Sequence, residues 1–159
     1  MAKFIYRMQN ILNLKEKMEE EAKNAYVAQQ ARLNAEEEKL AALIRKKSYY
    51  EEEGRRIRQT KLNIRDLEEN EYAVSTMTGL IMQQEEALKK EQELLEEKRS
   101  SFEEAMKERK TQEKLRENAF EEFKADLNYQ ESKEIDQLTS YVYGNRIRLA
   151  NQSGADSGS

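Results

Sequence analysis

Apolar residues recur along the first part of the chain with alternating spacings of four and three, the pattern by which one helix buries a stripe against another. This series of seven positions, six of them apolar, is Phe4, Met8, Ile11, Lys15, Met18, Ala22 and Ala25. The register then shifts, and apolar side chains recur every seven residues in three further series: Tyr26, Leu33 and Leu40; Leu43, Tyr50 and Ile57; Ile81, Leu88, Leu95 and Phe102. Polar residues such as Gln84, Glu91 and Lys98 fall between them. The pattern predicts long helices that pair along an imperfect coiled-coil seam.

Two segments compete for the turn between the helices. Asn63, Ile64 and Asp66 resemble a helix N-cap followed by an acidic first turn, which places the turn near 59–63. The alternative is 75–79, where β-branched and hydroxyl residues precede a glycine. Local propensity does not choose between them.

The C-terminal end of the chain is rich in small residues. Gly144 and Asn145 favour the end of the last helix there, and the Gly/Ser-rich stretch 151–159 predicts a disordered tail. We therefore expect a single all-α coiled-coil domain over residues 1–150.

Composition agrees with long helices and narrows the function. The 159 residues include no proline and five glycines, and 37% are apolar, fewer than the 45–50% typical of a globular domain. With no cysteine and no histidine, thiolate catalysis, a catalytic triad, a zinc site and a disulfide framework are excluded. No Gly-x-x-x-x-Gly-Lys phosphate loop is present. We expect no enzymatic activity, no cofactor and no metal.

Charged residues alternate in sign along the chain. Acidic runs at 36–38 and 51–53 neighbour basic runs at 45–47 and 55–56, which indicates solvated helix faces rather than a metal site. The net charge of -4, without a basic stripe, argues against nucleic-acid binding. The chain has neither an apolar run of ~18–20 residues nor the apolar core of a signal peptide. We expect a cytoplasmic protein that does not insert into a membrane.

Several short strings occur in an order that resembles one family. They are Phe4-Ile5-Tyr6-Arg7-Met8, Glu108-Arg109-Lys110, Glu113-Lys114-Leu115-Arg116-Glu117, Phe120-Glu121-Glu122-Phe123 and Glu131-Ser132-Lys133-Glu134-Ile135-Asp136. Together they resemble the flagellar FliJ proteins, small coiled-coil components of the flagellar type III export apparatus. The resemblance covers about residues 3–145 and favours the turn near 59–63.

The resemblance implies an antiparallel two-helix coiled coil similar to the stalk subunit of rotary ATPases. Such a protein would bind the export ATPase ring and promote its assembly, link the ring to the cytoplasmic domain of the export gate platform protein, and handle export chaperones. It would lie at the inner face of the cell membrane at the flagellar base. A second interpretation stays open, in which the same seams pair between chains as a parallel homodimer with no role in export.

Two sets of contact residues follow from the resemblance and the hairpin geometry. The ATPase contacts are expected where the two chain ends meet: Phe4, Tyr6, Arg7, Ile11, Leu14, Leu138 and Tyr141. The gate contacts are expected near the turn: Leu43, Tyr49, Tyr50, Val74 and Met77. Tyr49 and Tyr50 are consecutive on a helix, so they cannot both face the seam.

Overall fold

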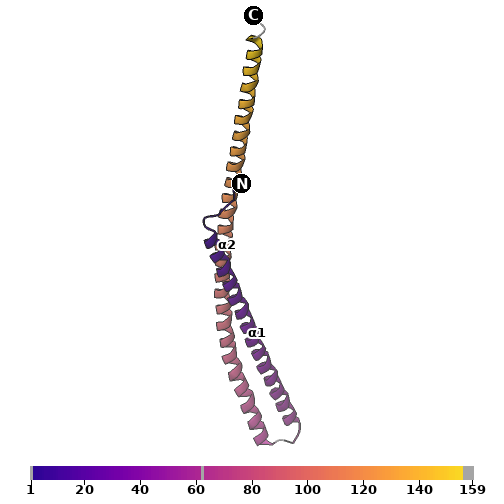
Figure 1. The fold of residues 1–159 in the computed structure, drawn as a ribbon. Helices are drawn as coiled ribbons and strands as arrows, with labels where there is room; N and C mark the ends of the chain where they lie inside the picture. Colours follow the sequence, from indigo (N-terminus) through magenta and orange to yellow (C-terminus); the bar gives the residue numbers. More distant parts are fainter. Residues whose placement is uncertain (1, 62, 156–159) are drawn as a thin grey trace. The chain divides into compact units, whose positions relative to one another are not determined.

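Two long helices make up the computed structural model, which describes residues 2–61 and 63–155 and contains no strand in those ranges. Helix α1 spans Gln9–Gln59 and helix α2 spans Ile64–Ala155 (Figure 1). Residues 60–63 connect them, at the first of the two candidate turn sites, whereas 75–79 lie inside α2.

The start of α2 has the predicted cap. The side-chain oxygen of Asn63 accepts a hydrogen bond from the backbone nitrogen of Arg65 at 3.1 Å, and Asp66 lies in the first turn. Both features satisfy or complement the free N–H groups at a helix start.

The contacts divide the chain into two compact units. The hairpin unit is Leu14–Arg109, and the terminal unit consists of the described parts of Met1–Asn13 and Lys110–Ser159. Whether residues 1–150 behave as one domain stays a prediction.

In the hairpin unit a few of the less exposed residues, such as Ala25 and Ala73, lie beside the seam, but most follow one unbroken alternation of threes and fours on each helix. On α1 they are Lys15, Glu19, Ala22, Tyr26, Gln29, Leu33, Glu36, Leu40, Leu43, Lys47, Tyr50, Gly54 and Ile57. On α2 they are Leu67, Asn70, Val74, Met77, Ile81, Gln84, Leu88, Glu91, Leu95, Lys98, Phe102, Ala105 and Arg109. The predicted antiparallel coiled coil is confirmed, and the two seams pair within one chain rather than between parallel copies.

The predicted register is wrong at the start of α1. Leu12 is only 4% exposed, whereas Ile11 and Met18, which we expected in the seam, are 38% and 40% exposed. Lys15 and Ala22 lie in the seam as predicted, but Glu19 takes the place of Met18 and Tyr26 that of Ala25, so the series continues without the predicted shift. The physical reason is that Glu19 forms an ion pair with Arg109 of the other helix, so a charged residue can occupy the seam.

Two reciprocal glutamine–glutamate pairs cross the seam of the hairpin unit. The Gln29 amide nitrogen donates to the backbone carbonyl of Glu91 at 3.2 Å and also to its carboxylate. The Gln84 amide nitrogen donates in the same way to the carbonyl of Glu36 at 3.0 Å and to its carboxylate. On each helix the glutamine precedes the glutamate by seven residues. Each helix therefore donates hydrogen bonds through one glutamine amide and accepts hydrogen bonds through one glutamate.

These pairs satisfy polar groups inside the seam. Gln29 is 4% exposed, and a buried amide without partners would cost about 1–3 kcal/mol. The hydrogen bond from Gln84, followed by that from Lys39, lowers the pKa of Glu36 below its usual value. These hydrogen bonds favour the ionised form of Glu36, whose carboxylate accepts the hydrogen bond from Gln84.

Further contacts cross the seam toward the open end of the hairpin unit. The Lys15 ammonium lies 2.9 Å from a carboxylate oxygen of Glu108. The rings of Tyr26 and Phe102 stack with centroids 6.3 Å apart. Polar and aromatic contacts thus occur in the seam alongside its aliphatic side chains.

In the terminal unit, the N-terminal strap (residues 2–8) packs against α2. It contains no helix before α1 begins. The Phe4 ring meets Phe120 edge-on at 5.1 Å and lies 5.5 Å from Phe123. Phe4 therefore packs on α2 from a non-helical segment, not from the helix that the seam pattern predicted.

Helix α2 continues beyond the strap, which corrects two expectations. It does not end at Gly144 but runs through Ala155, so residues 151–155 of the predicted disordered tail are helical. No proline interrupts this stretch, an internal glycine costs only about 1 kcal/mol, and the Ser153 hydroxyl donates to the Ala150 carbonyl at 2.9 Å. Residues 156–159 of the predicted tail lie outside the described residues.

The seam assignment predicts the effect of removing one buried leucine. Leu33 is 5% exposed, so Leu33→Ala should lower the free energy of unfolding by about 2–4 kcal/mol. Val27, on the same helix but 56% exposed, is the matched control, and Val27→Ala should change it by no more than about 0.5 kcal/mol. Urea unfolding followed by circular dichroism measures both; equal effects would show that the seam is misassigned.

Candidate partner-binding surfaces

The N-terminal strap and α2 form the walls of an open groove of about 720 Å³ in the terminal unit. It is lined by Phe4, Ile5, Tyr6, Arg7 and Met8 of the strap and by Ala119, Glu122, Phe123 and Asp126 of α2. We call this the strap groove. Its shape depends on the strap being held against the helix.

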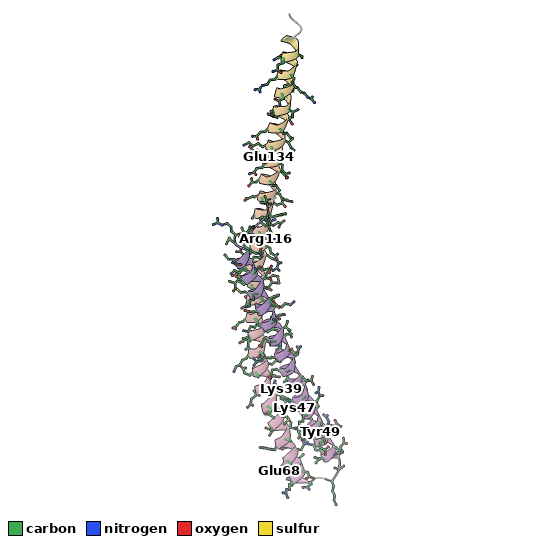
Figure 2. The ribbon with its side chains drawn as sticks, viewed as in Figure 1. Lys39, Lys47, Tyr49, Glu68, Arg116 and Glu134 are labelled. Atoms are coloured by element: carbon green, nitrogen blue, oxygen red, sulfur yellow. The ribbon has the colours of Figure 1, made fainter. Side chains whose placement is uncertain are left out.

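Two sets of contacts hold the strap and the adjoining first residue of α1 in place. The Arg116 guanidinium carbon lies 5.8 Å from the centre of the Phe4 ring, and its Nε donates to the side-chain oxygen of Gln9 at 2.9 Å (Figure 2). The strap also supplies the first acceptors of α1, because the carbonyl of Tyr6 accepts from Gln9 and that of Met8 accepts from Leu12. The strap is therefore an ordered part of the fold.

The groove combines an apolar floor with charges of both signs. Glu122 and Asp126 are one helical turn apart on α2, so their carboxylates share a side of the groove. Arg7 is exposed, and the buried Tyr6 hydroxyl has no hydrogen-bond partner among the described residues. Such a groove can take an apolar side chain of a partner and offer hydrogen-bonding groups around it.

The structure separates the ATPase contacts that we predicted as one group. Phe4, Tyr6 and Arg7 line the strap groove, and Ile11 is 38% exposed in the same unit. Leu14 belongs to the hairpin unit, where it is 53% exposed.

Leu138 and Tyr141 do not lie beside the strap, which is a correction. They are 65% and 67% exposed on α2, and Leu138 is about 22 Å further along the helix axis than Phe123. The reason is helix length: α2 has 92 residues and α1 has 51, so the chain ends cannot coincide.

The predicted gate contacts divide by exposure. Leu43, Tyr50, Val74 and Met77 lie in the seam of the hairpin unit, and Met77 is only 8% exposed. Tyr49 points outward, is 64% exposed and meets the Tyr50 ring edge-on at 5.7 Å (Figure 2). Of these five residues, Tyr49 is the one that is largely exposed to a partner, and its ring contacts that of Tyr50 in the seam.

Two residues near the turn were missed by the sequence reasoning. Asn70 is 8% exposed, and its amide nitrogen donates to the backbone carbonyl of Tyr50 at 2.7 Å. Its side-chain oxygen lies against Gly54, where an added Cβ would be only 2.3 Å away. Glycine at this seam position allows the asparagine to enter. The sequence signal for this position was the spacing of Gly54, which continues the seven-residue repeat of Tyr26, Leu33 and Leu40.

The described part of the chain contains no cluster of acidic side chains able to hold a metal ion and no helix long and apolar enough to cross a membrane. Comparison with protein families matches residues 4–148 to the family described as Flagellar FliJ protein. No curated protein and no solved structure matches the chain.

The contact between Gly54 and Asn70 predicts opposite effects for two glycine substitutions. Gly79 has no neighbour within 4 Å, so Gly79→Ala should raise the free energy of unfolding by up to about 1 kcal/mol through helix propensity. Gly54→Ala gains the same propensity but displaces Asn70 from the Tyr50 carbonyl, and should lower the free energy of unfolding by about 1–2 kcal/mol.

Repeating Gly54→Ala in a variant without Asn70 tests whether the clash with Asn70 causes the loss of stability. In a chain that carries Asn70→Ala, the clash is absent, and Gly54→Ala should become stabilising. Urea unfolding of the four variants measures this change of sign. If Gly54→Ala stabilises the parent chain as much as Gly79→Ala does, the contact is unimportant.

Proposed function

The chain belongs to the flagellar FliJ family and is a flagellar export-related component, and we propose that it connects the export ATPase ring to the export gate. In this role it binds the ring and promotes its assembly, contacts the cytoplasmic domain of the gate platform protein, and escorts export chaperones. It works by binding and catalyses no reaction. The family match over residues 4–148 is the observation that carries the proposal.

The strap groove supports an ATPase contact in the terminal unit. Aromatic residues and arginine are enriched in the cores of protein interfaces, and the groove offers Phe123, Tyr6 and Arg7 together. Ile5, which also lines the groove, is 78% exposed. An apolar side chain of the ATPase would enter the groove, with a basic group of the ATPase facing Glu122 and Asp126.

The outward tyrosine near the turn supports a gate contact in the hairpin unit. Tyrosine is frequent among the residues that dominate binding energy, because it combines a large rigid ring with a polar tip. The ring of Tyr49 rests on Tyr50, whose backbone carbonyl is held by Asn70. The contact with Tyr50 restricts the rotation of the Tyr49 ring, which lowers the entropy that binding has to remove.

The proposed location follows from the partners. By binding the gate, the chain would lie at the inner face of the cell membrane at the flagellar base without inserting into it. The chaperone role would use the same exposed side chains of the hairpin unit in a transient way.

Arg7→Glu tests the ATPase contact. Arg7 is exposed, so the variant should keep the helicity and change the free energy of unfolding by no more than about 0.5 kcal/mol. It reverses a charge at the groove, and we expect the concentration of the chain needed for ATPase-ring assembly to rise roughly tenfold, with loss of motility.

Lys3→Glu is the matched control, because Lys3 is also exposed and carries the same charge but does not line the groove. It should leave ring assembly at the parental concentration. If Arg7→Glu assembles the ring as the parent does, the strap groove is not the ATPase contact.

Tyr49→Ala tests the gate contact. Truncation of a central interface tyrosine typically costs about 2 kcal/mol or more, so the Kd for the cytoplasmic domain of the gate platform should rise roughly thirtyfold. Tyr129→Ala removes a tyrosine of similar exposure, 69% against 64%, from the far part of α2 and should leave this Kd unchanged. Calorimetry measures both, and equal Kd values for the two variants would reject the assignment.

A further inference from the structure

The last part of α2 lacks a packing partner in the terminal unit. From Asn128 to Gly154 every residue except Gly144 and Asn145 is exposed, and Figure 1 shows this part of α2 extending alone beyond the strap. An isolated helix is marginally stable in water, and a glycine near its middle weakens it further. A second surface that covers this part of α2 would stabilise it.

An apolar stripe runs along this lone helix with coiled-coil spacing. Ile135, Leu138, Val142, Asn145 and Leu149 follow one another at intervals of three and four and share one face. The four apolar members are 46–66% exposed. We call these five residues the C-terminal stripe. Exposed apolar residues gathered on one face mark an interaction surface.

The charges beside the stripe are arranged symmetrically. Glu134-Ile135-Asp136 and Arg146-Ile147-Arg148 lie on either side of Tyr141, with Glu134 and Arg148 seven residues from it and Asp136 and Arg146 five residues from it. Glu134 lies on the lone part of α2 (Figure 2). Among the described residues, none of these four charged side chains has an ion-pair partner.

We infer that the C-terminal stripe binds the stripe of a second copy of this chain in antiparallel orientation. A two-fold axis near Tyr141 would place Leu138 against Val142 of the second copy and Ile135 near Asn145 of the second copy. It would also place residues 134–136, with their two acidic side chains, beside residues 146–148 of the second copy, with their two arginines. Because the axis is two-fold, every charge pair would occur twice. A parallel arrangement would instead place like charges side by side, which is unfavourable.

The dimer does not require the proposed export function, but it would compete with one part of it. Leu138 and Tyr141 are also candidate ATPase contacts, so a dimer would cover them until the ATPase displaces the second copy. The contact spans only about four core layers and includes a polar asparagine. We therefore expect a weak association, with a Kd on the order of 10 μM.

A charge swap tests the pairing with the purified full-length chain. Sedimentation equilibrium between about 1 and 200 μM should show a monomer–dimer equilibrium. Glu134→Arg and Arg148→Glu should each raise the Kd roughly fivefold to tenfold, because each turns two attractive pairs into repulsive ones. An equimolar mixture of the two variants should associate as tightly as the parent, because both pairs are then of opposite charge.

Lys133→Glu is the matched control. It changes the net charge by the same amount as Arg148→Glu and lies on the same helix, but on the face opposite the stripe. It should dimerise as the parent does. Circular dichroism of each variant checks that the helices are retained.

Three results would overturn the proposal. The first is a chain that stays monomeric up to 200 μM, including one that is monomeric and binds the export ATPase through Leu138. The second is a mixture that associates no better than either variant alone. The third is equal weakening by Lys133→Glu, which would show that net charge rather than the pairing decides association.

Discussion

The register of the hairpin depends on the two reciprocal glutamine–glutamate pairs, while the short connection between Gln59 and Ile64 sets its direction. Only Leu12, Leu33 and Met77 are buried among the apolar side chains of the described residues, so aliphatic packing is too sparse to fix one alignment. A shift of the helices by one heptad would still bring apolar residues together, but it would remove Gln29 from Glu91 and Gln84 from Glu36. Each lost pair would leave a polar group in the seam unsatisfied, at a cost of about 1–3 kcal/mol.

The other special contacts of the hairpin unit agree with this alignment. Gly54 lies opposite Asn70, the one arrangement in which the asparagine can enter the seam without meeting a Cβ. Lys15 forms an ion pair with Glu108, and Glu19 forms one with Arg109. Polar residues thus give the seam its specificity, as a single buried asparagine does in other coiled coils, although they add little stability compared with leucine.

The sequence predicted the fold class because its period is regular from Tyr26 onward. It failed where polarity hides the period: Glu19 carries the seam while Met18 does not, and this follows only from Arg109 on the other helix. For the same reason the role of Gly54 was not predicted, although its spacing fits the seam, because that role exists only opposite Asn70. The sequence pattern predicted that Phe4 lies on a helix, because Phe4 fits the apolar spacing. In the structure Phe4 precedes the first residue of α1. The spacing of apolar residues along one helix does not reveal which residues of the other helix they contact.

A seam rich in polar residues also changes what the surface can do. Tyr49 faces outward because the alternating seam positions of the hairpin unit are already filled, in part by glutamine, glutamate and lysine, whereas Leu138 and Val142 lie on the part of α2 that has no seam partner. Burying these outward apolar groups against another protein gains about 25 cal/mol for each Å² removed from water, without disturbing the seam. The two tasks are therefore separated: polar pairs inside the seam determine how the chain folds, and apolar side chains outside it remain free to determine what the chain binds.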